Sequence, residues 1–224
     1  MPVKPRDSSP SPKRAGSAAE RAPDPEQGPG AALTRRGVAG AVTEVAAPAN
    51  VVAALLVVMA VSTAPPADAL RWAVISILFA SVLPMAYVIA QVRRRRVTDR
   101  HVRIRAQRRL PMLIAIATTV AGLALLTVFG APRPLVALAA AGVAGLVVTA
   151  VITEFWKVSM HAAVVGGAVT IVVIVFGISW LPFFALLVLV AWARVELGDH
   201  SVAEVVGGGA VGCAVAASVF LLLR

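Results

Sequence analysis

Residues 156–204 read WKVSMHAAVVGGAVTIVVIVFGISWLPFFALLVLVAWARVELGDHSVAE. Between Ala162 and Ala193 this stretch holds no charged side chain, whereas both of its ends are rich in histidine, cationic and acidic residues. Apolar runs of this length are typical of helices buried in a lipid bilayer. Ionisable groups beside such helices cost free energy unless they have a role, so the two ends are candidate functional segments.

The composition of the whole chain is that of a membrane protein. Of its 224 residues, 59% are hydrophobic and only 14% are charged, and the mean hydropathy is +0.86. We expect an all-α fold, a polytopic membrane helix bundle with six or seven transmembrane segments, because the sixth apolar segment is short for a complete crossing. The seven apolar segments are residues 45–64, 70–92, 112–129, 135–152, 162–178, 183–193 and 201–223.

The first 44 residues differ in composition from the rest of the chain. They are rich in Pro, Ala, Gly and Ser and hold almost no large apolar side chain, which predicts a disordered N-terminal tail. Residues 45–224 are then expected to form the transmembrane domain. The sequence leaves the oligomeric state open.

The positive charge is concentrated in one loop. Nine of the 21 Lys and Arg residues lie between Arg93 and Arg109, and Asp99 is the one acidic residue there. Between two membrane segments such a run indicates a cytoplasmic loop that meets anionic phospholipid headgroups, rather than a nucleic-acid site. This predicts the cell membrane as the location, with a cytoplasmic N-terminus. If the sixth segment crosses, residues 154–161 and 194–200 return to the same face as the basic loop.

The residue types at the ends of the opening stretch favour phosphate chemistry. His200 and Glu204 are four residues apart, so on a helix the carboxylate can hold one ring nitrogen and leave the other free. Arg194, just upstream, carries a planar guanidinium suited to phosphate oxygens. The other end supplies a second cation, a hydroxyl and a second imidazole: Lys157, Ser159 and His161. Two histidines with several cations indicate a phosphate site more than a metal site.

These residues resemble two motifs of the type-2 phosphatidic acid phosphatases, membrane relatives of the vanadium haloperoxidases. The third motif of that family is Ser-Arg, five residues, His, three residues and Asp. Arg194, His200 and Glu204 keep this spacing, with Ala in place of Ser and Glu in place of Asp. The second motif is Pro-Ser-Gly-His, of which Ser159 and His161 remain. The chain thus resembles a divergent prokaryotic member of the superfamily.

The first motif of the family, Lys, six residues and Arg-Pro, is degenerate here. Arg108 matches its arginine, while His101 stands at the lysine position and Arg109 replaces the proline. Arg105 or Arg103 would supply the missing cation. The resemblance covers residues 93–215, the motif-bearing core of a phosphatase-like domain.

The resemblance implies metal-independent hydrolysis of a membrane lipid phosphate or prenyl (pyro)phosphate, with no cofactor. His200 would be the nucleophile and form a phosphohistidine, Glu204 would orient it, and His161 would protonate the leaving oxygen. The implied phosphate-binding residues are Arg194, Lys157, Ser159, Arg108 and Arg105.

Two other kinds of function remain open at the sequence level. One is a catalytically inactive protein that binds anionic lipid. The other is a transporter-like bundle whose polar residues line a pathway across the membrane.

Overall fold

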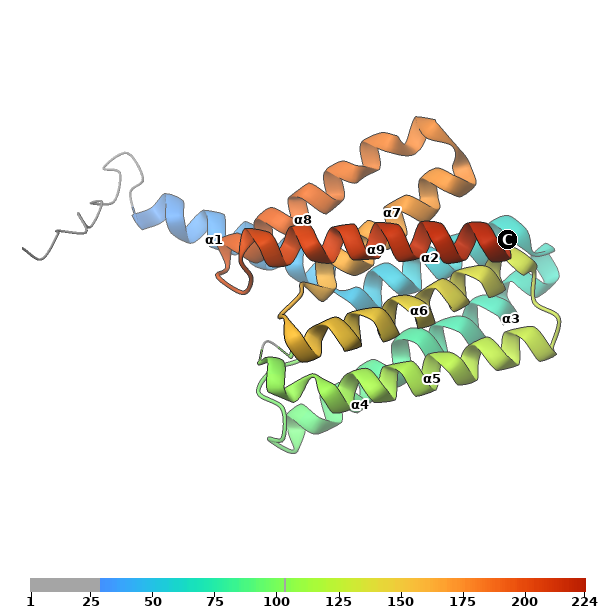
Figure 1. Cartoon of the computed structure of the whole chain (residues 1–224), viewed down its shortest axis with the longest axis horizontal. Coiled ribbons are helices and arrows are strands. Elements are labelled where there is room, and N and C mark those ends of the chain that lie inside the picture. The colour runs from blue at the N-terminus through green and yellow to red at the C-terminus, as the bar shows by residue number, and fades with distance from the viewer. Residues whose placement is uncertain (1–28, 103) are drawn as a thin grey trace, which may run out of the picture.

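The computed structural model describes residues 29–102 and 104–224, with side chains from residue 34 on, and every regular element in these ranges is helical (Figure 1). This confirms the all-α fold. The long helices are α1 (Pro29–Val45), α2 (Pro48–Thr63), α3 (Pro66–Ile77), α4 (Leu83–Arg93), α5 (Arg109–Val128), α6 (Arg133–Phe155), α7 (Met160–Phe176), α8 (Phe184–Glu196) and α9 (Val202–Leu223). A π-helical turn, η1 (Leu78–Val82), joins α3 to α4, and 3₁₀ turns η2 (Arg105–Gln107) and η3 (Ile178–Phe183) precede α5 and α8.

The described helices offer five or six membrane spans, which agrees with the lower of the two predicted numbers, six, and not with seven. Five stretches are long and apolar enough to cross a bilayer, and α1 with α2 forms a sixth if the pair, bent by 47°, counts as one span. Helix α7 is one of the shorter apolar helices because it begins only at Met160, after an extended segment. Large apolar side chains such as Phe155 and Leu222, each more than 80% exposed, cover the outside, as a membrane protein requires.

Helix α1 corrects the prediction of a disordered tail. Residues 29–44 lie within this helix, which packs along α8 and carries an ion pair of 3.0 Å between Arg35 and Glu196. Its inner face is made of small residues, with Ala39 and Thr43 buried one turn apart. Small residues allow close helix packing in a membrane without large apolar side chains, and this is why composition misled the prediction. Residues 1–28, the rest of the predicted tail, lie outside the described residues.

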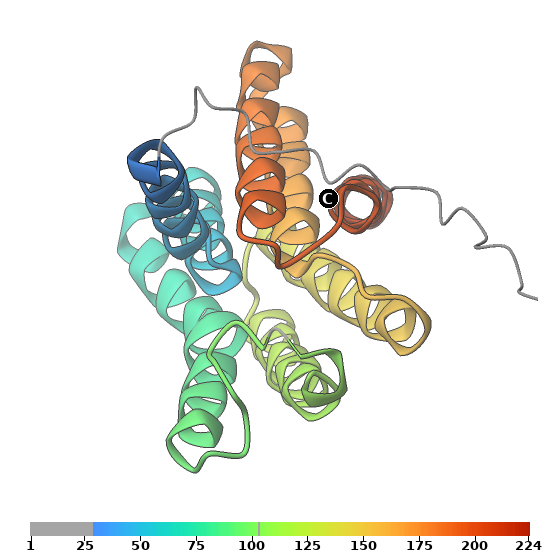
Figure 2. The same ribbon diagram turned by 90° about the vertical axis from the view of Figure 1, so that its left-hand side faces the viewer.

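The connections that carry the polar clusters meet at one end of the bundle. The α1–α2 junction, the α4–α5 loop, the α6–α7 connection and the α8–α9 connection all lie at the left of Figure 1 and face the viewer in Figure 2. Two hydrogen bonds link the α6–α7 connection to its neighbours. Ser159 N donates to the Glu204 carbonyl oxygen of α9 at 3.1 Å, and Arg108 Nη1 donates to the Val158 carbonyl oxygen at 3.0 Å. The predicted convergence of three separate clusters is confirmed.

Glycines hold α7 and α9 together just behind this end. A Cβ added at Gly212 would lie on the Ala163 carbonyl oxygen, far inside van der Waals contact, and one added at Gly208 would lie 2.5 Å from the Ser159 carbonyl oxygen. Gly208 and Gly212 thus belong to a small-residue packing face of α9. This close approach sets the start of α7, which carries His161, against the start of α9, which carries Glu204.

Candidate active site

A tight turn after α8 brings His200 back beside Arg194. Gly198 ends the helix with φ +73°, a left-handed conformation that glycine adopts without a Cβ penalty. The backbone N–H groups of Asp199 and His200 then donate to the Arg194 carbonyl oxygen at 3.1 and 3.2 Å. Ser201 caps the next helix, so His200 sits directly before the N-terminus of α9. The turn thereby places a histidine and an arginine in one small volume.

The His200 imidazole is fixed by Glu204. The distance from Nδ1 to Glu204 Oε2 is 2.8 Å, and Nδ1 is the donor because an ionised carboxylate can only accept. The same Oε2 accepts the Ser201 backbone N–H at 3.2 Å, which completes a capping box at the start of α9. Nε2 of His200 is therefore the ring nitrogen left for a ligand. Glu is the residue type that a capping box uses at this position.

Two buried arginines supply positive charge. Arg194 is only 1% exposed, and its Nη1 lies 2.9 Å from Asp199 Oδ2. Arg108 is also buried, and its Nε and Nη1 donate to the carbonyl oxygens of Val102 and Val158 at 2.9 and 3.0 Å. These bonds hold the α4–α5 loop against the α6–α7 connection, so both guanidinium groups are fixed in place before a ligand arrives.

These side chains surround the polar end of a cavity of about 450 Å³. Arg108, His161, Arg194 and His200 all line it, and most of the rest of its wall is apolar. His161 is 4% exposed, and within the part of the chain that the structure describes its Nε2 has no hydrogen-bond partner. An unsatisfied buried ring nitrogen is costly, so its presence at a cavity wall indicates a place for a ligand.

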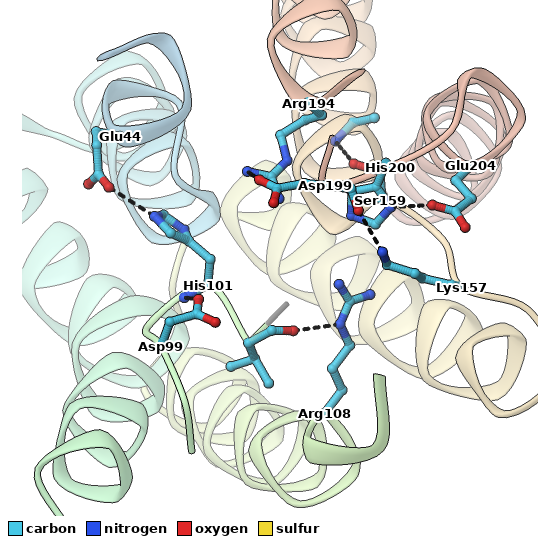
Figure 3. Close-up of polar contacts among 12 residues, drawn as sticks. Glu44, Asp99, His101, Arg108, Lys157, Ser159, Arg194, Asp199, His200 and Glu204 are labelled. Carbon is cyan, nitrogen blue, oxygen red and sulfur yellow. Dashed lines mark hydrogen bonds and ion pairs between the residues drawn. The ribbon is translucent and has the colours of Figure 1, made fainter. Parts of the chain in front are cut away.

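A second histidine–carboxylate pair, not predicted as part of the site, faces the first one. His101 Nε2 lies 2.9 Å from Glu44 Oε1, and the His101 ring lies 5.3 Å from the His161 ring between centroids. Arg100 makes an ion pair of 2.5 Å with the same Glu44. Figure 3 shows His101 and Glu44 on one side of the site and His200 with Glu204 on the other. All three of these additional residues line the cavity.

The sequence contained a signal for only some of the site residues that were not predicted. His101 stands where the resemblance to the phosphatase motif expects a lysine, which makes it a candidate. Glu44 lies in the segment predicted to be a disordered tail, where no pattern points to a site. Asp199 stands out only as a possible helix cap, whereas in the structure its carboxylate pairs with Arg194.

Three predicted phosphate-binding residues have other partners and do not line the cavity. Arg105 is exposed and donates to the carbonyl oxygens of Glu154 and Phe155 at 2.5 and 3.4 Å. It thereby supplies hydrogen bonds to carbonyl groups at the C-terminal end of α6. Arg103, the alternative to Arg105, lies outside the described residues. Lys157 Nζ donates to the Asp199 carbonyl oxygen at 2.6 Å and so supports the turn that carries His200. Ser159 is fully buried and caps α7 through the Ala162 backbone N–H at 3.4 Å.

Acid is expected to destabilise the folded protein through His200. Burial lowers the pKa of His200 to about 4, although the hydrogen bond to Glu204 raises it. In the unfolded chain the pKa is about 6.5, so between these values the unfolded state binds a proton that the folded state does not. The stability contributed by neutral His200 is fully present above pH 6.5 and is lost as the pH falls through 4. The free energy of unfolding would fall by up to about 3 kcal/mol.

Thermal melting in detergent at pH 7 and pH 4.5 measures this effect. Other groups titrate over the same range, so the comparison is with His200→Gln, which lacks the titrating imidazole. Wild type should lose several degrees more of Tm on acidification than the variant does. Equal losses in the two proteins would show that His200 does not titrate as its burial predicts.

The fold and the site together define a class of protein. It is an all-α bundle with helices of membrane-spanning length, and a cavity at one end is lined by histidine and arginine side chains. No protein-family model, no curated protein and no solved structure matches this chain.

Proposed function

We propose that this protein hydrolyses a lipid phosphate or prenyl (pyro)phosphate through a phosphohistidine at His200. One observation carries the proposal: a histidine oriented by a carboxylate lies at the polar end of an apolar cavity, beside two fixed arginines and a second histidine whose Nε2 lacks a partner among the described residues. Phosphoryl transfer needs positioning and stabilisation of charge, which this arrangement supplies.

The first step would transfer the phosphoryl group to the protein. The Nε2 lone pair of His200 attacks phosphorus, the bond from phosphorus to the lipid oxygen breaks, and His161 gives a proton to that oxygen. The lipid alcohol leaves, and the guanidinium groups of Arg108 and Arg194 balance the charge on the remaining phosphate oxygens. A bound phosphate dianion favours the protonated form of His161, because opposite charges at close range favour the charged state.

The second step would restore the protein. A water molecule attacks phosphorus, His161 takes its proton, and the bond between phosphorus and Nε2 breaks to release inorganic phosphate. Glu204 keeps the His200 ring in place through both steps and offsets the positive charge on the imidazole. In this scheme Arg108 and Arg194 carry the charge stabilisation, so a metal ion has no assigned role.

Phosphate release from a panel of lipids, measured with and without a chelator, tests the proposal. The panel contains phosphatidate, lysophosphatidate, phosphatidylglycerophosphate and farnesyl diphosphate, each in mixed micelles. We expect chelator-insensitive release from at least one of them, with an acid-labile phosphohistidine trapped on His200. No release from any lipid would favour the anionic-lipid-binding or transporter-like function instead. The cytoplasmic placement of the site and its location in the cell membrane stay predictions.

The proposed role of His161 makes a separate prediction. His161→Ala should lower the rate on an alkyl phosphate by about 10²–10⁴-fold, the usual contribution of a general acid. On 4-nitrophenyl phosphate the loss should be much smaller, because that leaving group departs without a proton. Equal losses on both substrates would assign His161 to binding or structure instead of acid catalysis.

A further inference from the structure

We infer that the cavity accepts one apolar chain of about fifteen carbons, so that the substrate is a single-chain lipid phosphate rather than a two-chain one. The inference rests on the proposed function for its phosphate end, and it adds the class of tail. A straight acyl chain and a branched prenyl chain are the two sources of such a tail. Volume, depth and wall chemistry of the cavity each support the inference.

The volume suits a single chain. A methylene group occupies roughly the space of a water molecule in the liquid, about 30 Å³. The cavity of about 450 Å³ therefore holds about fifteen carbon-sized groups. A membrane lipid with two long chains has at least twice that many, so the cavity cannot enclose both chains.

The depth also suits one chain. On α7 the lining runs from Met160 to Ile171. Ile171 lies ten residues beyond His161, which at 1.5 Å per residue is about 15 Å. Half of the roughly 30 Å hydrocarbon core of a bilayer is the same length, which is the depth that one lipid chain occupies within its own leaflet. A chain that enters with its phosphate at His200 would thus be enclosed along most of its length.

The wall beyond the histidines is mostly apolar, and glycines on α6 widen it. The α6 residues that line the cavity share one broad face of the helix: Leu138, Ala139, Ala141, Gly142, Gly145, Leu146 and Thr149. A Cβ added at Gly142 or Gly145 would meet nothing within 4 Å, unlike one added at Gly212, where α7 and α9 touch. The two α6 glycines are therefore not required by helix packing, and their effect is to leave room for a chain.

Chain-length selection by cavity-filling variants tests the inference. Gly142→Leu and Gly145→Leu each add four carbons to the wall, and Val151→Leu on the exposed face of α6 is the matched control. The ligands are straight alkylphosphonates of increasing length, a farnesyl phosphonate and a dioleoyl phosphonate. Their carbon–phosphorus bond is not hydrolysed, so binding is measured whether or not the protein has phosphatase activity. Native mass spectrometry from detergent counts the bound molecules.

Wild type and Val151→Leu should retain chains up to about fifteen carbons and retain the two-chain compound at least about tenfold less well. Each glycine variant should shorten the longest retained chain by about four carbons. Comparison of the farnesyl compound with the straight-chain compounds distinguishes a prenyl tail from an acyl tail. Retention of either kind supports a single-chain site. The inference is wrong if the two-chain compound binds as well as the single-chain ones.

The inference is also wrong if the longest retained chain is the same in both glycine variants as in wild type, while their Tm values equal that of wild type. If either variant is unstable, Gly145→Ala, which adds one carbon, replaces it and should shorten the limit by about one carbon. Failure of the proposed function looks different: length-dependent binding of phosphonates would persist, but no lipid of the panel would release phosphate.

Discussion

His200→Ala is expected to reduce phosphate release by about 10³-fold or more. The His200 imidazole is oriented by a carboxylate and lies beside Arg194, and its other ring nitrogen is left for a ligand. Its removal leaves phosphate binding largely intact, because Arg108 and Arg194 keep their own backbone and carboxylate partners. We therefore expect kcat to fall much more than KM rises, measured on the most active lipid of the panel.

Glu204→Gln provides the matched variant for this prediction. Glutamine also completes a capping box, so the start of α9 should be preserved while the negative charge beside His200 is lost. The expected loss of kcat is smaller, about 10²-fold, because the ring is still held but its positive charge is no longer offset. If His200→Ala retained more than a tenth of the activity, the phosphohistidine mechanism would be ruled out. A loss for Glu204→Gln as large as that for His200→Ala would indicate that Glu204 does more than orient the ring.

Gly212→Ala is expected to cost about 3 kcal/mol or more, the largest stability effect predicted here. The added Cβ would clash with the Ala163 carbonyl oxygen, which belongs to the backbone and cannot rotate away. Helices α7 and α9 would have to separate, and His161 would move relative to Glu204. Thermal melting in detergent should show a lower Tm, and the residual activity at low temperature should fall as well.

Gly145→Ala is the control for this change. It makes the same chemical substitution in a membrane helix, but its Cβ would meet nothing within 4 Å. Its Tm should equal that of wild type or exceed it slightly, since alanine is favoured over glycine in a helix by up to about 1 kcal/mol. Similar losses of Tm for the two variants would mean that the contact between α7 and α9 is not the reason for glycine at position 212.

The sequence predicted the helical fold well because a membrane restricts the choices. Long apolar runs form helices in a bilayer whatever their detailed composition, so segments such as residues 112–129 and 201–223 agree with α5 and α9 within a few residues. Helix α1 escaped prediction for a physical reason. Its buried face consists of Ala39, Thr43 and similar small residues, whose contribution depends on the close approach of α8, a tertiary contact that composition does not reveal.

The candidate site was predictable where residues act over short separations in the chain. His200 and Glu204 are four residues apart, and the helical period alone predicts their contact. Partners far apart in the sequence were not predictable: the Glu44–His101 pair joins residues 57 positions apart. Arg105, Lys157 and Ser159 have the right chemistry for phosphate, but each is needed by a helix end or a turn of the backbone. Residue type alone could not distinguish these two uses.

The shared oxygen of Glu204 would make the proposed catalysis sensitive to fraying of one helix end. Its Oε2 accepts both the Ser201 backbone N–H and the His200 ring, so unwinding of the first turn of α9 also releases the imidazole. Terminal turns open at lower free energy than a packed bundle unfolds. Mild denaturants, harsh detergents or a thin bilayer should therefore inactivate the protein while its overall helix content is still unchanged.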